Sequence, residues 1–350
     1  MSAREAGAAL AAAMGIGRFV YTPILPLMTS QAGLSAASAA SLATANYLGY
    51  FAGALATIVR APSRTANRVS LVLLVATLAG MPLTHSMAAW FVLRLLAGIA
   101  SAVVFVAAVN AGPGWGLSGV GIGIALSGLI VLAHARWEFA WWVAAALSAL
   151  LTVLAWPLQP EARKPQAAGT RKKGFGALFT SYTLEGVGYI IAGTFLVAAI
   201  GGPLGSSAWV LVGVAAALSV LITRGIPLPV ILAVQAMGIA LPALIGGTTA
   251  ALVSVVLFGG TFLTIAASSL KTGADLGFPR AAAVLTTGYS AGQIIGPLVA
   301  TPLLHHGYHQ ALLLAAGIVA AAALTAPALP SRRRAATRTP PHRTPAEPVE

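Results

Sequence analysis

The side chains best suited to chemistry in this sequence are charged residues within apolar stretches. Arg18 lies near the middle of an apolar run at residues 6–28, and about 20 apolar residues span the ~30 Å core of a bilayer. An arginine at that depth costs at least ~2.5–3.5 kcal/mol on insertion scales, unless it faces water, a ligand or a counter-charge. We therefore interpret Arg18 as a residue that lines an internal cavity.

Glu185 is the only carboxylate inside an apolar stretch, and Arg94 is the second arginine inside one. Three roles are open for Glu185: it exchanges a proton, it forms a structural ion pair with Arg18, or it contacts a bound solute. Arg94 is near enough to the end of its stretch to snorkel, and its small neighbours also fit a packed position in a proton relay or gate. The candidates for proton coupling are therefore Glu185, Arg18 and Arg94.

Polar and amphipathic side chains in the apolar stretches are candidates for the cavity wall. Buried polar groups need partners in lipid, and a cavity supplies them. Hydrogen bonding between helices is the alternative for each. The cavity candidates are Arg18, Tyr21, Asn46, Tyr47, Tyr189 and Gln293.

Glycines recur where helices are expected to pack closely or to bend at a gate. Four-residue spacing places three of them, Gly288, Gly292 and Gly296, on one stripe. The full set of packing or gating candidates is Gly15, Gly17, Gly121, Gly123, Gly128, Gly288, Gly292, Gly296 and Pro297.

The composition determines the class of protein to which these residues belong. Of 350 residues, 58% are hydrophobic and 8% are charged, against about a quarter charged in soluble domains. The chain is therefore an all-α polytopic membrane protein in contact with a lipid bilayer. The net charge of +13 comes from loops and the tail, so no nucleic-acid partner is expected. No phosphate-binding loop or nucleophile–base set is present, and we expect no enzyme activity, no cofactor and no metal.

Twelve apolar segments follow one another. A basic, proline-containing stretch at residues 159–175 divides a first half (1–158) from a second (176–330), and a basic tail (331–350) is expected to be disordered. With the N-terminus inside, seventeen lysines and arginines fall in inner loops or tails and Arg136 alone falls outside. The positive-inside rule therefore predicts twelve transmembrane helices with both termini cytoplasmic. The segments are 6–28, 39–59, 69–86, 88–109, 115–133, 138–157, 176–200, 204–222, 227–245, 249–270, 281–304 and 308–329.

An internal repeat relates the two halves. Residues 15–20 (GIGRFV) match residues 186–191 (GVGYII) at an offset of 171, and residues 119–130 match residues 288–299 at an offset of 169. Two six-helix halves in the same orientation are the parallel repeat of the major facilitator architecture, in which the substrate binds at the midplane between them.

Residues 14–26 (MGIGRFVYTPILP), 45–50 (ANYLGY) and 121–128 (GIGIALSG) resemble the YbfB/YjiJ-type branch of the major facilitator superfamily. Residues 94–98 (RLLAG) are similar to that superfamily's arginine–glycine motif in the fourth helix. The resemblance implies a bacterial inner-membrane secondary transporter, driven by protons. The sequence departs from the pattern at residues 59–68, a loop that keeps its arginines and lacks the aspartate that latches the inner gate.

The expected function is secondary active transport of a small organic solute, as proton-coupled efflux by alternating access. Uptake of a small anion held by Arg18 is one alternative. A non-transporting sensor or partner protein on the same fold is another, favoured by the missing loop aspartate. We expect a monomer.

Overall fold

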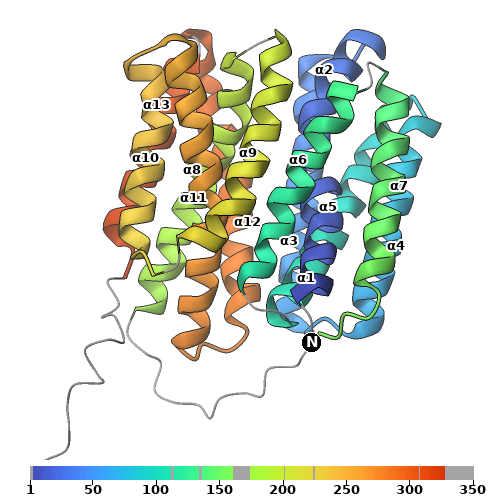
Figure 1. The fold of residues 1–350 in the computed structure, drawn as a ribbon, viewed down its shortest axis with the longest axis horizontal. Coiled ribbons are helices and arrows are strands. Elements are labelled where there is room, and N and C mark those ends of the chain that lie inside the picture. The colour runs from blue at the N-terminus through green and yellow to red at the C-terminus, as the bar shows by residue number, and fades with distance from the viewer. Residues whose placement is uncertain are drawn as a thin grey trace, which may run out of the picture.

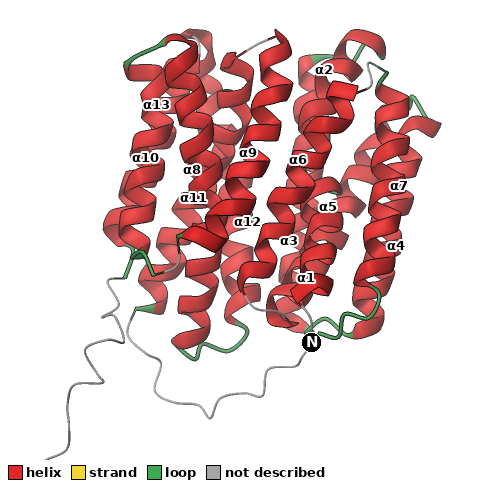
Figure 2. Ribbon diagram, in the orientation of Figure 1, coloured by secondary structure: helices red, strands yellow, loops and turns green. Residues whose placement is uncertain are grey.

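The computed structural model describes residues 3–111, 114–133, 136–160, 174–200, 202–223, 225–306 and 308–327. Throughout these ranges every regular element is a helix, as the colouring of Figure 2 shows. Most of the predicted linker at 159–175, and the whole tail at 331–350, lie outside the described residues. The all-helical prediction is therefore confirmed for the part of the chain that the structure describes.

The N-terminal half holds seven α-helices, α1 to α7, with short π and 3₁₀ turns between some of them. Ser35 and Ser63 begin two of these helices as N-caps, since each hydroxyl oxygen accepts a hydrogen bond of 3.1 Å from a backbone N–H three residues on. The elements are α1 (Ala3–Leu10), η1 (Ala11–Ile16), α2 (Tyr21–Gln31), α3 (Ala36–Val59), α4 (Arg64–Gly80), η2 (Met81–Leu83), α5 (Met87–Ala111), η3 (Gly114–Leu117), α6 (Ser118–Ala133) and α7 (Trp137–Ala155).

The C-terminal half holds the remaining helices. They are α8 (Phe175–Ile200), α9 (Gly202–Ile222), α10 (Leu228–Leu244), α11 (Gly247–Asp275), α12 (Ala281–Ala300), η4 (Thr301–His306) and α13 (Tyr308–Thr325). In Figure 1 the helices α8 to α13 form one side of the molecule and α1 to α7 the other.

The helices agree with the apolar segments of the sequence to within a few residues at most ends. Among the described residues, eight stretches are long and apolar enough to cross a membrane, six of them in the N-terminal half. Helices α9 and α10 supply shorter apolar segments. The structure thus supports a multi-pass membrane protein, and the count of twelve spans stays a prediction.

Glycines lie where helices meet backbone to backbone. A Cβ on Gly15 of η1 would collide with the backbone of Gly123 on α6, and one on Gly292 of α12 would collide with the backbone of α8. Across the boundary between the halves, a Cβ on Gly121 of α6 would meet the backbone of Ala217 on α9, and one on Gly213 of α9 would meet that of Ala125. The two halves therefore touch along α6 and α9 with little side-chain interdigitation.

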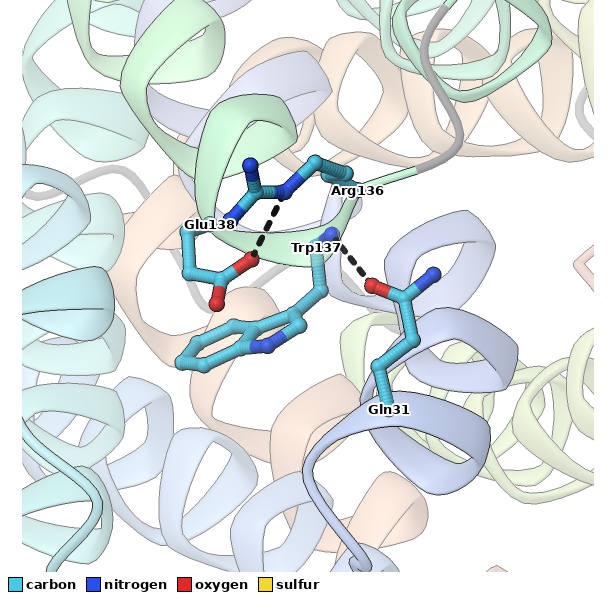
Figure 3. A network of polar contacts seen from close by, with 4 residues as sticks. All are labelled: Gln31, Arg136, Trp137 and Glu138. Atoms are coloured by element: carbon cyan, nitrogen blue, oxygen red, sulfur yellow. Dashed lines mark hydrogen bonds and ion pairs between the residues drawn. The ribbon is translucent and has the colours of Figure 1, made fainter.

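The ends of α2 and α7 are joined near Arg136 (Figure 3). The backbone N–H of Trp137 donates to Oε1 of Gln31 at 3.1 Å, and Nε of Arg136 lies 3.9 Å from Oε2 of Glu138. The Trp137 ring packs edge-on against Trp90 at 5.8 Å between centroids. These contacts fix one end of the N-terminal half as a single packed unit.

Candidate functional site

The first membrane-spanning stretch is interrupted next to Arg18. After α1 comes a π-helical turn, η1, and residues 17–20 form a turn before α2 begins. The N–H of Gly17 bonds to the carbonyl of Ala12, and that of Phe19 to the carbonyl of Met14, each five residues back. Such an interruption is tolerated in a membrane helix when neighbouring groups satisfy the backbone atoms that it frees.

Helix α5 satisfies the freed carbonyls. Arg94 donates from Nη1 to the carbonyl of Gly17 at 3.4 Å and from Nη2 to that of Arg18 at 3.1 Å. The Ser101 hydroxyl, two turns further along the same helix, lies 2.9 Å from the carbonyl of Ala13 and 2.7 Å from that of Ala97 in its own helix, so the two carbonyls share its one proton. Arg94 is 3% exposed, so the snorkelling interpretation of Arg94 is wrong: its charge stays inside and holds the backbone that carries Arg18.

Two of the predicted cavity residues make helix–helix hydrogen bonds within the N-terminal half. Asn46 donates from Nδ2 to the carbonyl of Arg94 at 3.1 Å, and the Tyr21 hydroxyl donates to the carbonyl of Ala39 at 3.0 Å. The guanidinium carbon of Arg94 also lies 4.8 Å from the centre of the Tyr21 ring. For Tyr21 and Asn46 the alternative of helix packing therefore describes the structure better than a cavity wall.

Arg18 lies at the boundary between the halves. Its Nη2 donates to Oε1 of Gln293 on α12, which belongs to the other half. Its guanidinium carbon is 4.0 Å from the centre of the Tyr50 ring and 5.6 Å from the centres of the Tyr47 and Phe19 rings. Arg18 is 3% exposed, and its Nε and Nη1 have no hydrogen-bond partner among the described residues.

The ion pair that was considered between Arg18 and Glu185 does not form in this structure. In the described chain, no carboxylate lies within 4.0 Å of Arg18, and the ion pairs there are Arg136–Glu138 and Lys271–Asp275. Glu185 is fully buried, and its Oε1 accepts a hydrogen bond of 3.4 Å from Nε2 of Gln235 on α10. The reason is geometric: Glu185 is one turn before Tyr189, the repeat partner of Arg18, and its side chain meets α10 instead of α1.

Three tyrosine rings of the C-terminal half pack against one another. The ring centroids of Tyr189 and Tyr289 are 5.7 Å apart. Tyr182 stacks on Tyr289 at 4.7 Å. Tyr182 and Tyr189 lie three residues before and four residues after Glu185 on α8, so they share its helix face.

A cavity opens beside this aromatic layer, between the halves. It is a narrow space with a mostly apolar wall, and it is partly open. Phe19 and Tyr50 from the N-terminal half and Tyr189, Tyr289 and Gln293 from the C-terminal half are part of its wall. Arg18 touches Tyr50 and Gln293, so its charge lies at the edge of this cavity.

Sequence reasoning missed Tyr50 and Tyr182 as cavity residues and did not pair Gln235 with Glu185. The signal was the helical spacing, since residues three, four or seven apart share a face. Tyr50 is three residues after Tyr47, a residue that was selected. Tyr182 is three residues before Glu185 on α8.

A second contact joins the halves at the end where α3 terminates. Arg280, between α11 and α12, donates from Nη1 to the backbone carbonyls of Ile58 and Val59, the latter at 2.7 Å. Arg280 has φ 54°, in the left-handed region, which non-glycine residues rarely adopt. A cation at the C-terminus of a helix is also favoured by the helix dipole. The loop that lacks the expected aspartate is therefore held by an arginine of the other half.

Comparison with known proteins assigns the chain to a family. A family model described as "Uncharacterised MFS-type transporter YbfB" matches residues 10–327. No curated protein sequence gave a significant match.

Among solved structures, the human organic anion transporter MFSD10 (TETRAN) superposes with a TM-score of 0.70 at 14% identity, covering 93% of this chain and 99% of that one. The nucleoside transporter NupG, crystallised as a point mutant, superposes with a TM-score of 0.64 at 16% identity, covering 92% of this chain and 98% of that one. At such low identity these likenesses establish a shared fold alone.

Proposed function

The chain belongs to the YbfB-type family of major facilitator transporters, and on that premise we propose that it carries a small organic solute by alternating access. The solute binds in the cavity between the halves. The observation that carries the proposal is the contact of Arg18 with Gln293: a buried charge of one half is bound by the other half beside the cavity. A rocking motion of the halves must break and remake that contact.

Coupling to protons is assigned to Glu185. In the part of the chain that the structure describes, its Oε2 has no hydrogen-bond partner, and neither does Oε1 of its neighbour Gln235. Both atoms are acceptors, and a carboxylic acid adds the donor that a carboxylate lacks. A proton on Glu185 therefore suits this buried site, and its release when the site opens to the other side of the membrane would couple transport to a pH gradient.

The halves slide against each other along α6 and α9. Gly121 and Gly213 let the two backbones approach there, and Trp209 on α9 donates from Nε1 to Oγ of Ser127 on α6 at 3.2 Å. The contact of Arg280 with the end of α3 closes one side. We take that side as cytoplasmic, with twelve spans, both termini inside, and a monomer in a bacterial inner membrane.

We take efflux as the direction, because a cavity with many aromatic walls and a single acid suits loosely specified organic cargo. Uptake of a small anion is the second candidate. The two unpaired nitrogens of Arg18 favour it.

The test uses purified protein in liposomes that contain the pH-sensitive dye pyranine. Pools of organic acids, amines and neutral compounds are added outside, and luminal pH reports proton movement coupled to any of them. Wild-type protein should respond to at least one pool.

Arg18→Gln should abolish the response, whereas Arg136→Gln, which changes an exposed arginine (80% exposed side chain), should keep it. A response that is unchanged by Arg18→Gln would contradict the site, and a wild-type protein that responds to no pool would favour the non-transporting alternative.

A further inference from the structure

The central site carries two positive charges, and no described residue forms an ion pair with either of them. Arg18 and Arg94 are both buried, each 3% exposed, and each lies within electrostatic reach of the other. Through the described chain neither arginine has a carboxylate within 4.0 Å. The embedded acid Glu185 is bonded to Gln235. A buried charge without a counter-charge is costly, so a bound anion would stabilise this region.

The two arginines are not equivalent as anion ligands. Arg94 uses both of its terminal nitrogens on backbone carbonyls and keeps only Nε without a partner among the described residues. Arg18 uses one terminal nitrogen on Gln293 and keeps both Nε and Nη1 unpaired there. Unpaired guanidinium N–H groups bind carboxylate and phosphate oxygens strongly and directionally. Arg18 is therefore the ligand, and Arg94 fixes the backbone from which it projects.

The surroundings of Arg18 select the kind of anion. The guanidinium packs on the rings of Tyr50, Tyr47 and Phe19, and cation–π contacts of this kind stabilise a cation less than an ion pair does inside a protein. The adjacent cavity wall is mostly aromatic and aliphatic, and Phe105 and Phe262 extend it. A small hydrated anion would lose its water there and gain few polar partners, whereas an aromatic or aliphatic body fits such a wall.

From these observations we infer that the substrate class is an organic monoanion, a carboxylate on an aromatic or apolar body, with its carboxylate accepting a hydrogen bond from Nε–H or from Nη1–H of Arg18. The inference deepens the proposed function, and it rests on the cavity being the transport site.

Direct binding tests it without requiring transport. Purified wild-type protein in detergent is titrated with benzoate, with neutral benzamide, with cationic benzylammonium and with acetate, and thermal stabilisation is measured at fixed pH and ionic strength. Benzoate should stabilise the protein at concentrations at least tenfold lower than benzamide, benzylammonium or acetate. Inorganic phosphate and chloride separate an organic from an inorganic anion site, and both should be weaker than benzoate.

Variants then locate the site. Arg18→Gln should remove the preference for benzoate over benzamide, and Arg18→Lys should retain part of it through its charge. Arg136→Gln should leave the preference unchanged. Equal binding of benzoate and benzamide, tighter binding of phosphate or chloride, or no binding of benzoate to wild-type protein would each overturn the inference. The comparisons between ligands use wild-type protein, so they still test the inference if an Arg18 variant does not fold. Since binding is scored apart from transport, a protein that moves solutes yet shows no carboxylate preference would retain the proposed function and lose this inference.

Discussion

Gln235 on α10 donates from Nε2 to Oε1 of Glu185 on α8 at 3.4 Å, deep inside the C-terminal half. This amide–carboxyl contact separates the acid from Arg18, which is bound instead by Gln293. The site is therefore divided: the acid and its amide belong to one half, and the arginine that lies at the cavity edge belongs to the other.

Glu185→Gln should lower the rate of transport driven by a pH gradient at least tenfold, while substrate counterflow continues. The amide cannot release a proton, yet it keeps the size and the hydrogen-bonding capacity of the acid. Both assays are run in the same proteoliposomes. Glu138→Gln, which changes a partly exposed acid at the end of α7 (34% exposed side chain), is the matched control. Proton-driven transport at the wild-type rate in the Glu185→Gln protein would exclude Glu185 as the proton carrier.

Arg18→Gln and Glu185→Gln should have additive effects on thermal stability. Removal of one member of a buried ion pair typically costs ~3–5 kcal/mol, and the double change recovers part of it. Because these two side chains bind different partners, we expect a coupling free energy below about 0.5 kcal/mol in a double-mutant cycle. Recovery of stability in the double variant would show that the residues pair in a conformation other than this one.

Arg94→Gln should destabilise the protein more than Arg18→Gln does. Arg94 makes two hydrogen bonds to carbonyls of the interrupted first span, and a hydrogen bond to a charged group contributes about 1.5–3 kcal/mol. Arg18 has one hydrogen bond and lies at the cavity edge. Thermal unfolding of the two variants in the same detergent gives the ranking, and the reverse order would mean that the backbone at residues 17 and 18 does not depend on Arg94.

Arg280→Ala should open the side of the molecule where α3 ends. The substitution removes the bonds to the carbonyls of Ile58 and Val59, so the population open at that end should rise. The sequence contains no cysteine, so a single cysteine introduced at Thr286, in the cavity wall, can be labelled without background. A severalfold faster reaction with a thiol reagent from that side is expected. An unchanged rate would show that other contacts hold this side closed.

Reporter fusions test the predicted orientation. Fusions after Gly174 and after Ser331 should both report a cytoplasmic location, and one near Arg136 should report an external one, because seventeen basic residues are assigned to the inner side. An external signal at Gly174 would refute the division into six plus six helices.

The helices could be predicted because apolar runs of membrane length are an unambiguous signal, and the charges inside them identified Arg18, Arg94 and Glu185 in advance. The partners of those charges could not be predicted. From the sequence, either Gln235 or Arg18 could be the partner of Glu185. Which one it is depends on the direction in which the Glu185 side chain projects from α8. Sequence spacing does not fix that direction, because an error of one residue in the alignment turns the side chain by about 100° around the helix axis.

The break in the first span was only partly predictable. Pro23 has no N–H to bond to the carbonyl of Phe19, four residues back, so a proline at this position disfavours a continuous helix through residues 17–20. The bonds from Arg94 that hold the freed carbonyls lie at a distance in sequence and could not be predicted.

The π-turn gives the first span an adjustable register. A π-turn contains one residue more than an α-turn, and a single residue corresponds to a rotation of about 100° around an α-helix. If the surplus residue moved past residue 18, the arginine would turn away from Gln293 while the helix on either side kept its place. The span would then act as a rotary element, and the turning of one short segment would accompany the rocking of the halves that parts Arg18 from Gln293.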